Sequence, residues 1–157
     1  LLEKLTACCA SRAWVNRLAK TRPFTDRADL IAKAQQSFEG LSTDDWLEAF
    51  KAHPRIGDAG ALGNRKDRHA SWSRGEQGQV TQAGDQTLSD LKEMNDRYYE
   101  KFGFVFLICA TGLSAETMLA ALQTRIDHTR EGEVETAAHE QRKITEIRLN
   151  KLIEEGA

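Results

Sequence analysis

Residues 102–110 read Phe102-Gly-Phe-Val-Phe-Leu-Ile-Cys-Ala110, the longest nearly uninterrupted apolar run in the chain. Its aromatic and β-branched residues favour an extended conformation, and Gly103 and Gly112 bracket most of it. No other segment has this character, and one strand cannot form a sheet. We therefore expect a buried extended segment threaded between helices. Its backbone N–H and C=O groups must find partners outside a β-ladder, a bound ligand among them.

Helical spacing of apolar residues is found on both sides of this run. Before it, the pattern and its caps predict three helices: residues 1–20, about 28–38 with Asp26 as N-cap, and one that Ser42 caps and that ends near His53-Pro54. After His53, an irregular stretch over 55–72 precedes four predicted helices: one from Ser73 to about Gly84, about 88–101, one capped by Ser114, and about 133–153. The sequence thus predicts an all-α fold. It is a single-domain helical bundle over residues 1–157 with one buried extended segment at about 102–110.

Composition excludes several classes of protein. The 157 residues are 40% apolar with a net charge of −2, which fits one folded domain and gives no general attraction to nucleic acid or to anionic membranes. Three cysteines, at positions 8, 9 and 109, do not form a disulfide framework, and no Cys or His pair has metal-ligand spacing. No apolar run approaches the ~18 residues of a membrane span, and no signal peptide is recognisable. We expect a cytoplasmic protein without a metal site.

His53 is the first candidate for chemistry. It stands at a predicted helix end beside a rigid proline and leads into the irregular stretch. An imidazole titrates near neutral pH and can give or take a proton there. The alternative is a surface histidine that only ends its helix.

Two further sites carry polar groups suited to a planar, polar small molecule. Glu76 and Gln77 lie at the start of the helix predicted from Ser73, where free N–H groups favour anions, although Ser73 and Glu76 also fit a simple capping box. Arg148 lies between two apolar residues near the end of the last helix and has the fork that binds a carboxylate. It is equally interpreted as a solvated arginine or as the partner of a nearby glutamate. Cys109 lies inside the apolar run and is interpreted as packed rather than nucleophilic.

Four motifs occur in a fixed order along the chain: His53-Pro-Arg-Ile-Gly57, Ser73-Arg-Gly-Glu-Gln77, Asn95–Tyr98 with Lys101-Phe-Gly-Phe-Val-Phe106, and Glu140-x-x-Lys-Ile-x-x-Ile-Arg-Leu149. Together they resemble the 2-oxo-4-hydroxy-4-carboxy-5-ureidoimidazoline (OHCU) decarboxylases of urate breakdown. Lesser matches at Trp14, Pro23-Phe24 and Arg125 extend the resemblance over nearly the whole chain. Two features depart from the family pattern: His128 stands where asparagine is expected, and the loop between His53 and Ser73 has its own sequence.

The resemblance implies an all-helical carboxy-lyase that converts OHCU to (S)-allantoin, usually as a homodimer and without cofactor or metal. It implies catalytic roles for His53 and Glu76. The substrate contacts that it implies are Pro54, Ser73, Glu76, Gln77, the backbone of Ile108, Cys109, Ala110, Thr111 and Gly112, and Arg148. Two alternatives stay open from the sequence. One is an inactive relative that serves as a helical binding or scaffold module, and the other is a decarboxylase or hydrolase of a related ureide.

Overall fold

The structure is a computed structural model that describes residues 1–55 and 84–156. This part of the chain contains helices and no strand, as the predicted all-α class requires. The helices are α1 (Leu2–Cys8), α2 (Arg12–Lys20), α3 (Arg27–Ser37), α4 (Thr43–Lys51), α7 (Asp85–Phe102), α8 (Ala115–Arg125) and α9 (Arg130–Glu154). None of these helices is long and apolar enough to cross a membrane. The irregular stretch after Arg55 and the helix predicted from Ser73 lie outside the described residues.

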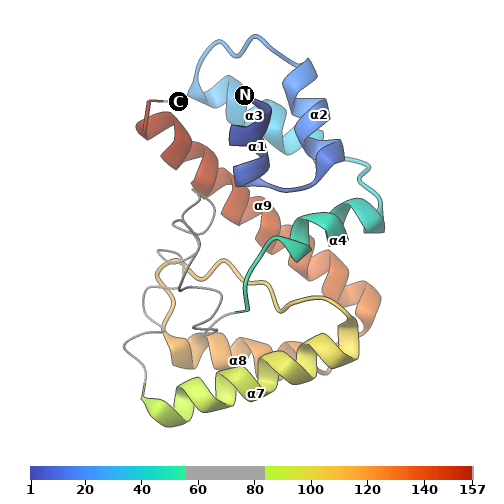
Figure 1. Ribbon diagram of the computed structural model, residues 1–157, viewed down its shortest axis with the longest axis vertical. Helices are drawn as coiled ribbons and strands as arrows, with labels where there is room; N and C mark the ends of the chain where they lie inside the picture. Colours follow the sequence, from blue (N-terminus) through green and yellow to red (C-terminus); the bar gives the residue numbers. More distant parts are fainter. Residues whose placement is uncertain (56–83, 157) are drawn as a thin grey trace.

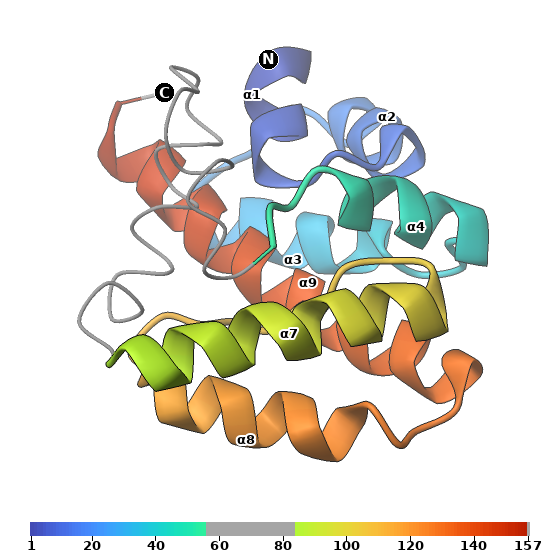
Figure 2. The same cartoon turned by 60° about the horizontal axis from the view of Figure 1, so that its bottom comes forward.

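The long helix α9 joins the two ends of the molecule (Figure 1). Helices α1, α3 and α4 contact α9, while α7 packs along α8. The N-terminal part of α9 reaches the α7–α8 pair, and its C-terminal part runs beside α1 (Figures 1 and 2). The described helices therefore form two groups on a shared central helix.

Side-chain caps explain most helix boundaries. Asp26, Ser42 and Ser114 accept hydrogen bonds from the backbone N–H three residues on, as predicted, and Ser42 with Asp45 forms a complete capping box. Thr129 also caps a helix, so α9 begins at Arg130, before its predicted start at residue 133.

The prediction of one helix over residues 1–20 is wrong. Cys9 is extended, with φ −153° and ψ 122°, and ends α1. Ser11 then accepts a hydrogen bond from the Trp14 N–H and begins α2. A serine competes for backbone donors, so it starts a new helix where apolar spacing alone suggests a continuous one.

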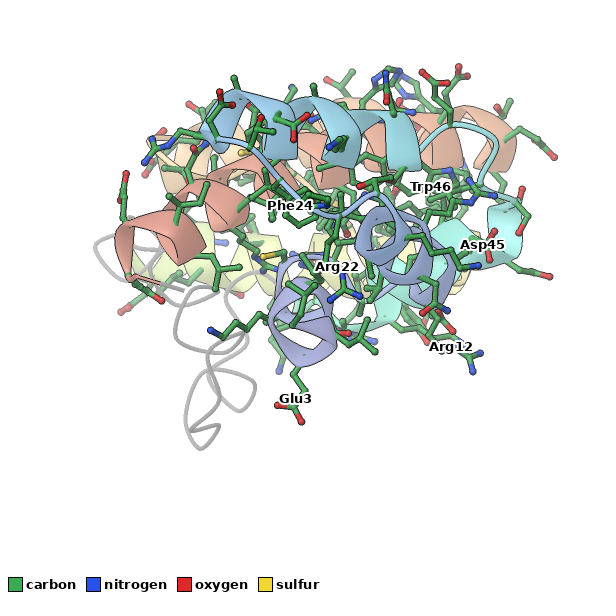
Figure 3. The ribbon with its side chains drawn as sticks, turned by 90° about the horizontal axis from the view of Figure 1, so that it is seen from above. Glu3, Arg12, Arg22, Phe24, Asp45 and Trp46 are labelled. Atoms are coloured by element: carbon green, nitrogen blue, oxygen red, sulfur yellow. The ribbon has the colours of Figure 1, made fainter. Side chains whose placement is uncertain are left out.

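A chain of neighbouring aromatic rings runs through the core. Successive ring centroids lie 5.3 to 6.3 Å apart along a chain that crosses four elements: Trp14 (α2), Phe38 (C-cap of α3), Trp46 and Phe50 (α4), and Phe104 beyond α7. Seen from above, Trp46 lies among the helices, whereas the charged side chains of Glu3 and Arg12 point away from the body of the protein (Figure 3). Aromatic burial on this scale supplies much of the apolar contact area in a small domain.

The segment between α7 and α8 has no regular secondary structure from residue 105 to 110 and passes along the helices (Figure 1), and Phe104, Phe106 and Leu107 are buried in it. Phe102 differs from the prediction because it is the last residue of α7, which ends where Gly103 takes a left-handed conformation with φ 79°. Side chains of α8 and α9 supply the hydrogen-bond partners that a neighbouring strand would supply in a β-sheet. The Leu107 carbonyl accepts a hydrogen bond from Arg125 Nη1 at 2.8 Å, and the Cys109 N–H donates to Glu140 Oε1 at 3.2 Å.

Candidate active site

His53 lies in the interior, just beyond the C-terminal end of α4. Its backbone N–H donates to the Phe50 carbonyl, and Pro54 prevents the helix from continuing. The side chain is buried, with 9% of its surface exposed. The interpretation of His53 as a surface histidine is therefore wrong, although its position at a helix end agrees with the prediction.

A polar ladder on α9 faces His53. His53 Nε2 lies 2.7 Å from Gln141 Oε1, and Gln141 Nε2 donates to Thr145 Oγ1 at 3.0 Å. Thr145 Oγ1 in turn lies 2.7 Å from the Gln141 carbonyl oxygen and 3.4 Å from the Cys8 carbonyl oxygen. Gln141 and Thr145 have no exposed surface. Polar groups so deeply buried are stable only when hydrogen-bonded, and these two satisfy one another.

Arg148 continues this ladder one turn beyond Thr145. Its side chain has no exposed surface, and Nη1 donates to the Ala7 carbonyl at 3.4 Å. The interpretation of Arg148 as a solvated surface arginine is thus wrong. A guanidinium keeps its charge in the interior, so Arg148 places a fixed positive charge on the same side of α9 as Gln141.

Glu140 brings the extended segment to the same helix. One carboxylate oxygen accepts from the Cys109 N–H, and the other pairs with Lys143 Nζ at 2.6 Å. A hydrogen bond and charge from Glu140 raise the pKa of Lys143, so the lysine amine is charged at neutral pH. Around Cys109, Ile108 is half-buried, Ala110 is buried, and Thr111 and Gly112 are exposed. Cys109 itself is half-buried and packs against the core, as interpreted from the sequence.

The residues around Pro54 are held from two sides. His53 faces α9, while the Arg55 guanidinium pairs with Asp96 of α7 and lies 4.7 Å from the centre of the Tyr99 ring. Pro54 itself is half-buried between these two anchors. The end of α4 is thereby fixed relative to both α7 and α9.

The structure brings His53 and Cys109 to neighbouring residues of α9, Gln141 and Glu140, about two helical turns before Arg148. Ser73, Glu76 and Gln77 lie outside the described residues. The sequence analysis gave no role to Gln141, Thr145 or Glu140. The helical periodicity of α9 indicates that Gln141 and Thr145 are buried, because both fall on the same face as the buried positions Ala137, Ile144 and Leu149.

The surroundings of the ladder also include a buried thiol. Burial raises the pKa of Cys9 from 9.0 to about 11, against weaker lowering by a hydrogen bond to the Ser11 backbone, by Thr145 and by Arg148. Cys9 is therefore protonated at neutral pH and is not a nucleophile. In the described ranges 1–55 and 84–156, no three His, Cys, Asp or Glu side chains gather as metal ligands.

Comparison with known proteins identifies the class. The sequence model of the OHCU decarboxylase family matches residues 1–150 of the chain. The chain belongs to the OHCU decarboxylase family.

Individual relatives agree with this. The chain is 36% identical over 156 residues to the uric acid degradation bifunctional protein TTL of Arabidopsis thaliana, covering 99% of this chain and 48% of that protein. It is 27% identical to the OHCU decarboxylase of Haloferax volcanii, over 87% of this chain and 79% of that one. The chain thus spans about half the length of the Arabidopsis relative.

A solved structure has the same fold. The crystal structure of an OHCU decarboxylase in the presence of (S)-allantoin matches with a TM-score of 0.79 and 34% sequence identity, over 96% of both chains. The likeness therefore includes every helix group described above rather than one part of the bundle.

Proposed function

We propose that this protein decarboxylates OHCU to (S)-allantoin in urate degradation. The observation that carries the proposal is the likeness, over 96% of both chains, to an OHCU decarboxylase crystallised in the presence of (S)-allantoin. The buried His53, facing α9 at the end of α4, supplies a group that can carry a proton.

The chemistry needs orientation, charge stabilisation and one proton. The bond from the ring to the carboxylate breaks, CO₂ leaves, and its electron pair is delocalised into the imine and carbonyl groups of the ring. A proton is then added to one face of a ring carbon to give the (S) product. Because the substrate accepts its own electrons, no cofactor is required in this proposal. General acid–base help is worth about 10²- to 10⁴-fold in such steps.

In this proposal His53 delivers the proton and Arg148 holds the substrate carboxylate or carbonyl. Arg148 lies seven residues after Gln141, or about 10 Å along the axis of α9. Helical side chains lean toward the N-terminus of their helix. Arg148 Nη1 lies 3.4 Å from the Ala7 carbonyl oxygen, and the next carbonyl along the chain, that of Cys8, lies 3.4 Å from Thr145 Oγ1.

The remaining contacts come from residues named by the family resemblance. We propose that Pro54 and the backbone of residues 108–112 border the ring, and that Ser73, Glu76 and Gln77 bind its polar edge, with Glu76 taking or sharing the hydroxyl proton.

The proposal includes a cytoplasmic homodimer. Light scattering coupled to size exclusion measures the dimer directly, and a monomer at micromolar concentration would contradict it.

Circular dichroism during allantoin formation tests the activity. OHCU is generated in situ from urate with urate oxidase and hydroxyisourate hydrolase, because it decays unaided to racemic allantoin. We expect a rapid (S)-allantoin signal with this protein. The rate of the His53→Ala variant should be about 10²- to 10⁴-fold lower than that of the unmodified protein, which corresponds to the contribution of acid–base catalysis.

The matched control is His139→Ala, the same substitution at an exposed histidine of α9. This variant should keep the rate of the unmodified protein. If folded protein gives no signal above spontaneous decay, the proposed function is wrong, and related ureides or a binding role become the candidates. If His53→Ala stays fully active, the reaction stands and the role of His53 fails.

A further inference from the structure

The direction of the hydrogen bonds in the ladder can be assigned from the Thr145 hydroxyl. A threonine hydroxyl has one proton to donate and lone pairs to accept with. The backbone carbonyl oxygen of Gln141 lies only 2.7 Å from Thr145 Oγ1. Two oxygens at that distance repel unless a proton lies between them. Thr145 therefore donates its proton to this carbonyl. The Cys8 carbonyl, at 3.4 Å on the other side, is a further acceptor and offers no proton.

This assignment fixes the orientation of the Gln141 amide. Because the Thr145 proton is already used, the hydroxyl can only accept from Gln141, so the amide NH₂ group faces Thr145 at 3.0 Å. The amide oxygen then faces His53. The reversed amide would place its oxygen against Thr145 and leave the 2.7 Å oxygen pair without a proton.

The orientation of the amide in turn fixes the imidazole. An amide oxygen only accepts, so the nitrogen 2.7 Å away, His53 Nε2, must carry a hydrogen. In a neutral ring the other nitrogen, Nδ1, then holds the lone pair. The side chains that make this assignment have little or no exposed surface, so water does not compete for their hydrogen bonds.

We propose that Gln141, oriented by Thr145, is a positioning residue that holds His53 as the Nε2–H tautomer. Nδ1 is then the nitrogen that first takes up a proton from solvent and afterwards delivers it to the ring carbon in the reaction. The tautomer itself follows from the geometry, whereas its use in catalysis rests on the proposed function. The ladder would act on catalysis through the histidine, and neither Gln141 nor Thr145 needs to touch the substrate.

Nuclear magnetic resonance of ¹⁵N-labelled histidine side chains tests the tautomer without any substrate. Spectra are recorded at about pH 8, above the ordinary histidine pKa of about 6.5, and His53 is assigned by the loss of its signals in His53→Asn. We expect a proton on Nε2 that exchanges slowly with solvent, and an unprotonated Nδ1. A proton on Nδ1 in the unmodified protein would overturn the proposal.

Two sets of variants separate positioning from packing. Gln141→Met keeps the volume but removes the acceptor, so the protected Nε2–H signal should disappear. Thr145→Val keeps the shape but releases the amide, so the signal should weaken, while Thr145→Ser keeps the hydroxyl and should retain it. If Gln141→Met does not fold, the valine and serine pair decides. An unchanged Nε2–H signal in folded Gln141→Met or in Thr145→Val would refute the role of the ladder.

Kinetics then address catalysis separately. In Gln141→Met, kcat for OHCU should fall about 10- to 100-fold, a part of the ~10²- to 10⁴-fold that acid–base catalysis supplies, and KM should change little. A rise in KM with unchanged kcat would contradict a positioning role. If the unmodified protein does not turn over OHCU at all, the proposed function fails, and the tautomer is still decided by the resonance data.

Discussion

Glu133 is a carboxylate without exposed surface at the N-terminal end of α9. Its Oε1 accepts from the Tyr98 hydroxyl at 2.6 Å and from Arg125 Nε at 2.8 Å, and its Oε2 lies 2.9 Å from His128 Nδ1. Burial, and then the hydrogen bond to Glu133, raise the pKa of Tyr98, which stays protonated and donates. His128 places a nitrogen donor where the family resemblance suggests asparagine, and an asparagine amide would supply the same kind of group. This substitution therefore preserves the donor to Glu133.

Ionisation of the Cys9 thiol should make the free energy of unfolding depend on pH. Its pKa is raised by burial from 9.0 to about 11, so the unfolded chain ionises first as pH increases. Above pH 9, ionisation of the Cys9 thiol stabilises the unfolded state, whereas the thiol of the folded state ionises only near pH 11. The free energy of unfolding should therefore fall through this window, by about 2 to 3 kcal/mol for a shift of this size. Below pH 9 the thiol has no effect.

Urea unfolding of the unmodified protein and of Cys9→Ala, measured from pH 7 to pH 11, checks this. Lysines, tyrosines and the other cysteines titrate in both proteins, so the difference between the two curves isolates Cys9. The small cavity in the variant shifts its curve by a constant amount. A difference that stays constant across the whole range would show that Cys9 titrates normally.

Only part of the candidate site was predictable at this scale. His53 was found from its place beside Pro54, and Arg148 from its chemical type. The burial of these two side chains could not be predicted from the sequence, because the partner of His53 lies 88 residues away along the chain. Gln141 was missed because apolar spacing is the signal for a buried helix face, and a buried amide interrupts that signal. A polar residue at a periodic core position is therefore a site signal in its own right.

Elements were predicted best where a capping side chain starts them. Ser42, Asp26 and Ser114 each act within three residues of the helix they begin, so their effect is local and visible in sequence. The break between α1 and α2 was missed because apolar spacing continues across it. The extended segment was predicted by elimination, but the donors and acceptors that hold it come from distant helices.

Glu140 is the residue by which α9 holds this segment. Glu140→Ala removes the acceptor for the Cys109 N–H, so amide hydrogen exchange at Cys109 should become faster. If the backbone of residues 108–112 contacts the substrate as proposed, KM should rise several-fold while kcat changes less. Hydrogen exchange read by NMR and steady-state kinetics on OHCU measure the two effects.

Two variants control this experiment. Glu140→Gln keeps an oxygen acceptor for Cys109 but loses the ion pair with Lys143, so it should resemble the unmodified protein in both measurements. Glu135→Ala makes the same truncation at an exposed position of α9 and should change neither. Unaltered exchange at Cys109 in Glu140→Ala would mean that the segment is held by other contacts.

For the whole molecule, two features connect the helix groups. One is α9, which contacts α1, α3 and α4 and also carries Glu133, the partner of Tyr98 in α7 and Arg125 in α8. The other is the aromatic chain, in which Phe104 lies 5.5 Å from Phe50 of α4 and 5.8 Å from Tyr98 of α7. A contact that both groups share couples their unfolding, so we expect one cooperative transition, as in a single domain.

Phe104→Ala tests this coupling, because it removes the ring that joins α4 to α7. Truncating a buried phenylalanine costs about 3 to 5 kcal/mol. Urea unfolding is followed by far-ultraviolet circular dichroism and by tryptophan fluorescence, with Trp72 replaced by Phe so that only Trp14 and Trp46 report on α2 and α4. Both midpoints should fall together and by the same free energy, although neither tryptophan belongs to the segment that was changed. Leu2→Ala, at a half-exposed position of α1, should shift the midpoints by no more than about 0.5 kcal/mol. Fluorescence and dichroism transitions that separate in Phe104→Ala would instead mean that the two helix groups unfold independently, with α9 too weak a link to make one domain of them.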